Sequence, residues 1–327
     1  MATFRQRGNR WQAQVRRKGQ PLETKSFTSR AEAERWARGI EADIDRGSYV
    51  NLTEAHRITL GALIDRYLVD VLPSLKGGPV DAIRLKALKR NRLCALSLAA
   101  LTPEQIAKFR DSRLTEVSNG TVIRELAYIS SIVNHARREW GVHIQNPVAL
   151  VKKPTSPKGR DRVFTLEEQA MILNDLLPKG RQSKWMHPLV VFALETAMRR
   201  GELLALDWKD VDLHKRVATL QDTKNGDRRS VPLSVKAATT LSKLPKSDCG
   251  KVFPMTGCAV SAALKRTLSR LHIADSRFHD LRHTAITQIA SKLPNVIELS
   301  AVSGHKSLRM LHRYYHPDVQ ELAKKLG

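Results

Sequence analysis

The hydrophobic and polar positions of the chain follow three successive patterns, and the first is that of a small sheet with one helix. Apolar and polar residues alternate over residues 11–15, which is the period of a half-buried strand, and residues 22–27 are expected to form a second strand. Ser29 and Glu32 then have the spacing of a capping box. The helix that follows carries one apolar stripe, made of Ala33, Trp36, Ala37, Ile40 and Ile44. Residues 1–57 are predicted to form a β-then-α module.

The second pattern is helical throughout and covers residues 58–151. Thr59 and Thr102 are expected N-caps, and Pro103 stands at the first helical position, which proline favours. Residues 76–79, Lys-Gly-Gly-Pro, are predicted to form a flexible loop. The apolar stripes consist of Leu60, Leu63, Ile64, Tyr67 and Leu68, then Ile106 and Phe109, then Leu126, Ile129 and Val133. This segment is predicted to be a helical bundle.

The third pattern mixes helices with short strands. Residues 152–161 form a basic linker that contains proline, glycine and serine, and a capping-box pattern from Thr165 to Glu168 opens the segment 162–327. Strands are expected over Val217–Leu220 and Arg229–Leu233, with a hairpin turn at Asn225-Gly226 between them. The predicted fold class is multidomain α+β, with a small N-terminal sheet plus helix, a helical bundle, and a mainly α domain that contains a small sheet.

The charge of the chain changes this picture by suggesting a partner. Lys and Arg outnumber Asp and Glu by 56 to 32, a net charge of +24. The excess is spread over the chain: +5 (12 basic, 7 acidic) in residues 1–57, +5 (13 and 8) in 58–151 and +14 (31 and 17) in 152–327. Several modules that each contact nucleic-acid phosphate would produce this distribution, and a generally basic solvated surface is the alternative.

Cysteine content and hydropathy limit the cellular compartment in which the chain is expected to act. Cys94, Cys249 and Cys258 are odd in number and form no C-x-x-C pair, so neither a disulfide framework nor a zinc finger is expected. No signal peptide and no membrane span are expected either, because the first residues lack an apolar core and no apolar run approaches 18 residues. A cytoplasmic, nucleoid-associated protein is therefore predicted.

Four clusters of polar residues in the third segment could carry chemistry. They are Thr196–Leu204 with Arg199, Thr223–Gly226 with Lys224, His279–His283 with Arg282, and Ser303–His316 with His305 and Tyr314. Taken singly, each residue has an ordinary explanation: a helix-end charge, a solvated hairpin lysine, a helical charge pair or a core tyrosine. Their joint occurrence is what requires an explanation.

Metal-free cleavage of a phosphodiester requires this set of side chains. Charge that develops on the non-bridging oxygens is matched by planar guanidinium groups, so two arginines are wanted. The protein must supply a nucleophile, and the leaving 5′-oxygen must receive a proton from a lysine or histidine. A tyrosine suits the first role because the phosphotyrosyl ester conserves bond energy for rejoining. The clusters supply both arginines and each of the other kinds of side chain.

In order and spacing, these residues resemble the tyrosine recombinases of the phage-integrase type. That family shows Arg, Lys, His-x-x-Arg, His and Tyr, with the tyrosine nine residues after the second histidine. Its positions match Arg199, Lys224, His279, Arg282, His305 and Tyr314 here, and Glu202 matches the acidic residue that follows the first arginine. The match is strong over residues 162–327. The earlier segments resemble, more weakly, the family's arm-binding (1–57) and core-binding (58–151) domains.

The resemblance implies a mechanism and a set of partners. Tyr314 would attack the scissile phosphate of double-stranded DNA to form a 3′-phosphotyrosyl link, while Arg199, Arg282 and His305 hold the phosphate. Lys224 would protonate the leaving 5′-oxygen, His279 would assist proton transfer or positioning, and Glu202 would be a structural support. No cofactor and no metal are implied. A homotetramer on core and arm sites is implied, with an accessory DNA-bending or excision factor as an optional partner, and integration or excision of a prophage or genomic island as the outcome.

Two positions depart from the family pattern, and one further segment is predicted from it. Ser303 stands where a large apolar residue often precedes the Gly-His pair, so the packing under His305 is expected to differ. Tyr315 adjoins Tyr314 and offers a second phenol. A terminal helix over residues 318–326 is predicted to dock on a neighbouring protomer.

Three rival functions remain open at this point. His279 and His283 imitate the H-E-x-x-H zinc site of metalloproteases, although Asp280 replaces the glutamate and a strongly basic chain suits a protease poorly. A DNA-binding protein with a decayed catalytic domain is the non-enzymatic alternative. A type IB topoisomerase shares the tyrosine chemistry but has no need of the N-terminal module.

Overall fold

A computed structural model of the chain describes most of its 327 residues. The described residues are 2–18, 22–46, 53–142, 144–180, 183–221, 228–293, 295–315, 320, 323–324 and 327. They fall into two compact units, Met1–Lys158 and Gly159–Gly327, which are described separately. The predicted α+β multidomain class is confirmed, whereas the finer boundaries at 57, 151 and 161 stay a prediction. No helix among the described residues has the length and apolar character needed to cross a membrane.

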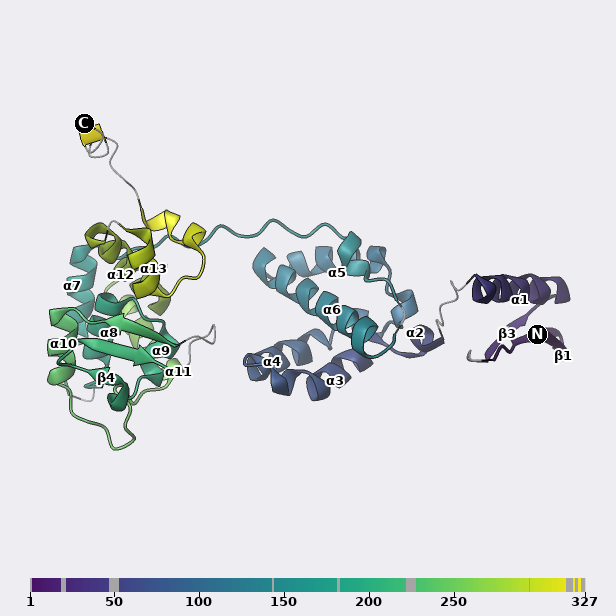
Figure 1. The fold of residues 1–327 in the computed structure, drawn as a ribbon, viewed down its shortest axis with the longest axis horizontal. Helices are drawn as coiled ribbons and strands as arrows, with labels where there is room; N and C mark the ends of the chain where they lie inside the picture. The colour runs from purple at the N-terminus through teal and green to yellow at the C-terminus, as the bar shows by residue number, and fades with distance from the viewer. Residues whose placement is uncertain are drawn as a thin grey trace. The chain divides into compact units, whose positions relative to one another are not determined.

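The first unit begins with the predicted sheet and helix. Strands β1 (Ala2–Arg7), β2 (Arg10–Val15) and β3 (Glu23–Phe27) pair antiparallel in that order, and α1 (Arg30–Asp45) lies along one face (Figure 1). Ser29 caps α1 by accepting a hydrogen bond from Glu32 N at 3.3 Å. Strand β1 was not predicted, because Phe4 is its single large apolar residue and its position is set by pairing with β2.

The rest of this unit is the predicted bundle, which has its own apolar core. Its elements are α2 (Thr53–Arg57), α3 (Leu60–Asp70), η1 (Leu72–Ser74), α4 (Gly78–Leu88), η2 (Arg92–Ala95), η3 (Leu98–Ala100), α5 (Pro103–Leu114), α6 (Asn119–Glu139) and η4 (Pro147–Leu150). Thr59 and Thr102 cap α3 and α5 as expected, with side-chain oxygens 3.1 and 3.3 Å from the amides they accept from.

The predicted loop at residues 76–79 is wrong in its second half. Helix α4 begins at Gly78 with Pro79 in its first turn, a position where the missing proline N–H costs nothing. Gly78 also packs against the chain before it, because a Cβ atom there would lie 2.3 Å from the Leu72 carbonyl oxygen. The glycine therefore permits close packing at a helix start, where a flexible loop was predicted.

The second unit surrounds a larger core to which most of its helices and strands contribute. Its elements are α7 (Leu166–Asp175), α8 (Met186–Thr196), α9 (Arg200–Ala205), η5 (Trp208–Asp210), β4 (Val211–Asp212), β5 (Val217–Leu220), β6 (Arg229–Pro232), α10 (Val235–Ser242), α11 (Gly257–Arg270), α12 (Phe278–Lys292), α13 (Val296–Ser303), η6 (Leu308–Met310) and η7 (His312–Tyr314). The sheet order is β4-β5-β6, antiparallel, so both predicted strands are confirmed and the short β4 is added. The capping box of Thr165 and Glu168 is confirmed at the start of α7.

A smaller apolar cluster packs α12 against α13 and the segment around η7. Its buried members are Ala197, Ala285, Ile286, Ala290, Leu299, Leu311 and Tyr314. Helices α12 and α13 contact each other and lie side by side in Figure 1. This cluster brings the segment after α8, the middle of α12 and η7 to one place.

Candidate active site

Arg199 lies in the turn between α8 and α9, and Glu202 fixes it there. Helix α8 ends where Ala197 adopts a left-handed conformation, with φ of 53°. Arg199 N and Nη1 then donate to the Glu202 carboxylate at 2.9 and 2.8 Å, and Nη2 approaches the Gly304 carbonyl oxygen at 3.4 Å. Arg199 therefore lies three residues beyond the apolar helix, close to the end of α13.

Glu202 also holds a second arginine that the sequence did not single out. Arg229, the first residue of β6, donates from Nη2 to Glu202 at 2.7 Å and from Nη1 to the Val302 carbonyl oxygen. Glu202 is only 6% exposed. Burial raises the pKa of its carboxyl, but Arg229 and Arg199 outweigh this effect and hold the pKa below its ordinary value. Glu202 is thus an ionised support that links α9, β6 and α13.

Arg282 on α12 is almost completely buried and is held by main-chain carbonyls. It is 4% exposed, and it donates to Ala197 O at 2.5 Å and to Ser303 O at 2.7 Å. Burial, together with the positive charge of Arg199, lowers its pKa to about 10. Arg282 therefore remains charged at neutral pH, and a negative charge placed beside it would stabilise the charged guanidinium.

His305 lies beside Arg282 in the turn that ends α13. Gly304 adopts a left-handed conformation with φ of 69°, which reverses the chain. Nδ1 of His305 lies 2.8 Å from Ser303 Oγ, and Nε2 lies 3.5 Å from Arg282 Nη2. Burial, with the charges of Arg282 and Arg199, lowers the pKa of His305 to about 4, so the ring is neutral at pH 7. The departure at Ser303 thus gives His305 a hydroxyl partner in place of apolar packing.

The two adjacent tyrosines have different surroundings. Tyr314 is 8% exposed, and its hydroxyl lies 2.5 Å from Nδ1 of His283. Burial raises the pKa of Tyr314, while Arg313 and Arg282 act in the opposite direction. The Tyr315 hydroxyl instead donates to the Leu293 carbonyl oxygen at 2.8 Å. Tyr314 therefore faces the histidines of α12, and Tyr315 stabilises the end of that helix.

His279 lies at the exposed start of α12. Its ring meets His283 edge to face, with centroids 5.0 Å apart. Partial burial of the ring lowers its pKa, and the charges of His283 and Arg282 lower it further. Arg282 thus points into the buried turn, whereas His279 pairs with His283, four positions further along the helix.

The comparisons with known proteins identify the family. The profile of the phage integrase family matches residues 163–321. The chain is 39% identical over 279 residues to the shufflon-specific DNA recombinase of Escherichia coli, covering 83% of this chain and 72% of that protein. It is 34% identical over 335 residues to an integrase/recombinase-type protein of Haemophilus influenzae, covering 98% of this chain and 89% of that protein. The chain belongs to the phage integrase family. It is a tyrosine-type site-specific recombinase.

Solved structures agree with this assignment at the level of the fold. A lambda integrase tetramer bound to a Holliday junction superposes with a TM-score of 0.67 at 20% identity, covering 94% of this chain and 93% of that chain. A Tn1549 transposon integrase in complex with a circular intermediate DNA superposes with a TM-score of 0.66 at 16% identity, covering 83% and 100%.

The recombinase brings most of the predicted site residues together. Arg199, Arg282, His305 and Tyr314 lie around the end of α13, and His279 reaches this group through His283. Lys224 belongs to residues 222–227, which lie outside the described part of the chain, as does the predicted Asn225-Gly226 turn. The zinc-protease alternative finds no support, since no group of three metal-ligating side chains occurs among the described residues.

Two contributors to the recombinase site were not predicted as such. His283 was considered only as a zinc ligand, although its spacing of four from His279 placed it on the same helix face. Arg229 gave no local signal, because its partners lie 27 and 73 residues away along the chain.

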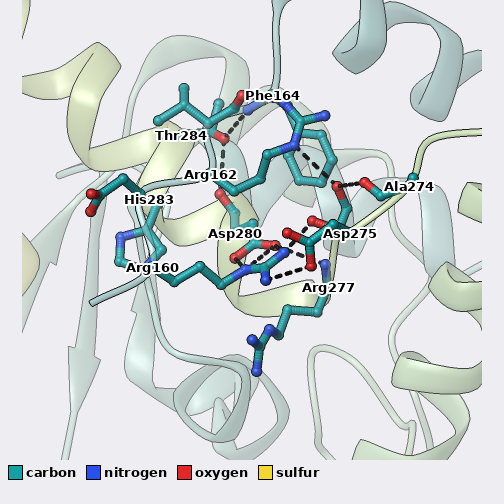
Figure 2. A network of polar contacts seen from close by, with 12 residues as sticks. Arg160, Arg162, Phe164, Ala274, Asp275, Arg277, Asp280, His283 and Thr284 are labelled. Atoms are coloured by element: carbon teal, nitrogen blue, oxygen red, sulfur yellow. Dashed lines mark hydrogen bonds and ion pairs between the residues drawn. The ribbon is translucent and has the colours of Figure 1, made fainter. Parts of the chain in front are cut away.

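The first turn of α12 is fixed by a polar network that includes the end of the linker (Figure 2). Arg160 donates from Nε to both carboxylate oxygens of Asp280, at 3.0 and 3.2 Å, and from Nη1 to Asp275 at 2.8 Å. Asp280 is fully buried and also accepts from Arg277 N at 2.8 Å, which caps the helix. Through this network, Arg160 sets the position of the helix turn that carries His279, Arg282 and His283.

Proposed function

We propose that Tyr314 is the nucleophile of this recombinase and that it forms a 3′-phosphotyrosyl bond with double-stranded DNA. The observation that carries the proposal is the position of its phenol, which lies beside His283 at 2.5 Å and within a cluster that contains two buried or half-buried guanidinium groups. Tyr315 is less suited to this role because its hydroxyl is bonded to a main-chain carbonyl.

The remaining roles follow from charge and hydrogen-bonding capacity. Arg199 and Arg282 bind the non-bridging phosphate oxygens, and His305, with a neutral ring, adds a further polar contact. Lys224 protonates the leaving 5′-oxygen, and His279 positions the group at the start of α12. In the second half of the reaction a 5′-hydroxyl of the partner DNA attacks the phosphotyrosine, which releases Tyr314. Bond energy is conserved, so the reaction consumes no nucleotide triphosphate.

Residues 1–57 and 58–151 supply further DNA contacts in this proposal, at arm and core sites respectively. Support comes from the sheet face opposite α1. Strand alternation places Arg5, Gln12 and Ser26 in one cross-strand row of that face and Thr3, Gln14 and Thr24 in the next. Such a polar, basic ribbon has the width and hydrogen-bonding groups that the DNA major groove accommodates.

The assembly and setting are proposed on the same basis. Four protomers act on two recombination sites, as in the lambda integrase tetramer on a Holliday junction. The tail over residues 318–326, most of which lies outside the described part of the chain, docks on a neighbouring protomer. An accessory bending or excision factor is an optional further partner. The element moved is a prophage or genomic island, and the protein acts at the nucleoid.

One experiment tests the nucleophile directly. The full-length protein is incubated in EDTA with a nicked DNA site from the flank of its own gene, and covalent protein–DNA adducts are separated under denaturing conditions. We expect an adduct with wild type and with Tyr315→Phe, and none with Tyr314→Phe. Loss of the adduct only in Tyr315→Phe would transfer the nucleophile to Tyr315. Tight binding without any adduct would favour a DNA-binding protein with a decayed site.

A further inference from the structure

Tyr314 needs a proton acceptor before it can attack phosphorus. Burial raises the pKa of its phenol, so the group is protonated at neutral pH. A phenol is a weak nucleophile, and its proton must leave as the bond to phosphorus forms. The roles proposed above assign a proton donor for the leaving oxygen but no acceptor for this proton.

The geometry points to His283 as that acceptor, and we propose that its Nδ1 takes the Tyr314 proton during strand cleavage. This inference rests on the proposed role of Tyr314. Nδ1 and the phenol oxygen are 2.5 Å apart, within the reach that general-base catalysis requires. The two rings lie nearly parallel, with an interplanar angle of 28° and centroids 5.9 Å apart.

The charges around His283 favour its role as a proton acceptor. Burial lowers its pKa, and Arg282 and Arg160 lower it further, so the ring is neutral at pH 7 and Nδ1 can carry a lone pair. The buried Asp280 carboxylate acts in the opposite direction and stabilises the imidazolium that proton transfer creates. Among the described residues, His279 and Tyr314 are the other titratable groups that contact the ring.

The other histidines are worse placed for this step. His305 uses Nδ1 to contact Ser303 Oγ at 2.8 Å, and its ring centroid lies 6.5 Å from that of Tyr314. His279 meets the edge of His283 and has no hydrogen bond to the phenol among the described contacts. His283 is also held firmly, because the preceding turn of α12 is fixed by the Arg160–Asp280 pair shown in Figure 2.

Each bond that breaks in the cleavage step is matched by a bond that forms. The Tyr314 O–H bond breaks as a bond from its oxygen to phosphorus forms, and the proton passes to Nδ1, which turns neutral His283 into a cation. The bond from phosphorus to the 5′-oxygen then breaks, and that oxygen takes a proton from the general acid, proposed to be Lys224. Rejoining runs in reverse: His283 returns its proton to the departing Tyr314 oxygen.

The test compares base and acid defects on two substrates. Single-turnover adduct formation is measured with an ordinary nicked site and with one whose scissile 5′-oxygen is replaced by sulfur, a leaving group that needs no protonation. The variants are His283→Asn, Lys224→Met, Tyr314→Phe and, as a matched control, His312→Asn, an exposed histidine two residues before Tyr314.

We expect His283→Asn to lower the adduct rate on the order of 10²- to 10⁴-fold with either substrate, while DNA affinity changes by less than about twofold. The sulfur substrate should rescue Lys224→Met but not His283→Asn. The wild-type rate should fall as the pH drops through the His283 pKa, below the ordinary value near 6.5, and His283→Asn should lack this limb. His312→Asn should match wild type.

Two further results keep the inference falsifiable. His283→Ala with added imidazole should regain part of the adduct rate, whereas a merely structural role would give no such rescue. A His283→Asn rate within about fivefold of wild type, or its rescue by the sulfur leaving group, would overturn the role of His283. An adduct in Tyr314→Phe would instead overturn the proposed nucleophile, so the two failures are distinguishable.

Discussion

Replacing Glu202 with glutamine should destabilise the second unit strongly without removing any group proposed to touch DNA. The carboxylate accepts from Arg199 N, Arg199 Nη1 and Arg229 Nη2 at 2.9, 2.8 and 2.7 Å, and it is 6% exposed. Glutamine keeps one acceptor oxygen and presents an amide donor to a guanidinium, so at least one charged donor loses its partner.

The magnitude follows from the burial of the pair. A hydrogen bond to a charged group contributes about 1.5–3 kcal/mol, and removing one partner of a buried ion pair costs about 3–5 kcal/mol. We therefore expect Glu202→Gln to lower the free energy of unfolding by about 3–5 kcal/mol. Arg282 should also be affected, because the Glu202 carboxylate raises its pKa against the effects of burial and of Arg199 and Arg229.

The assay must resolve this unit from the rest of the chain. Hydrogen exchange of the full-length protein in increasing urea, read by mass spectrometry, reports peptides from α8, α9 and α13 separately from those of the bundle. Glu202→Asp is the matched control, since it keeps the charge. A loss of less than about 1 kcal/mol in Glu202→Gln, or an equal loss in the bundle peptides, would refute the reasoning.

The other predictions concern neighbouring residues. Arg160→Lys should slow adduct formation on the order of 10- to 100-fold with DNA affinity kept, because lysine cannot bind Asp280 bidentately. Equal single-turnover rates of adduct formation in Arg160→Lys and wild type would exclude this role of Arg160. Stability should fall by about 3 kcal/mol between pH 6.5 and pH 4, since His305 has a pKa of about 4 when folded and protonates more readily when unfolded. Urea titrations of wild type and His305→Gln at pH 6.5 and pH 4 check this, and an equal loss of stability in the two proteins would contradict it. Gly304→Ala should displace Arg229, whose Nε would lie 2.8 Å from the added Cβ. In a double-mutant cycle, its loss of stability should be non-additive with that of Glu202→Gln, because both changes disturb Arg229. Simple additivity would argue against this shared effect on Arg229.

The sequence predicted helices and strands well where the residues that determine them lie close together in the chain. Thr59, Thr102 and Thr165 cap the helices they were expected to cap, because an N-cap depends on residues three positions apart. Strands β5 and β6 follow the apolar pattern of residues 217–220 and 229–233. The error at Gly78 arose because glycine followed by proline is typical of a loop and equally of a helix start.

The candidate site was predicted by order and spacing, and its contacts were not. Nothing near His283 in the sequence indicates a hydrogen bond to a tyrosine 31 residues later, and Arg229 reaches Val302 across 73 residues. Such contacts depend on how α12, α13 and β6 pack, which is a property of the whole core. The choice between Tyr314 and Tyr315 likewise rested on spacing alone until the structure gave each hydroxyl a different partner.

The charges at the site explain why these arginines suit one particular step. Arg199 and Arg229 pair with the Glu202 carboxylate, and Arg282 has no carboxylate partner among the described contacts. Three guanidinium groups and one carboxylate give a net charge of about +2 while the histidines are neutral. Main-chain carbonyls orient Arg282 without neutralising it, and burial lowers its pKa, with the positive charge of Arg199 acting in the same direction. A phosphodiester brings one negative charge, and attack by the Tyr314 oxygen, the proposed nucleophile, would bring a second as its proton leaves. The surroundings therefore compensate the pentacoordinate state more fully than the bound substrate, which is the condition for accelerating the chemical step.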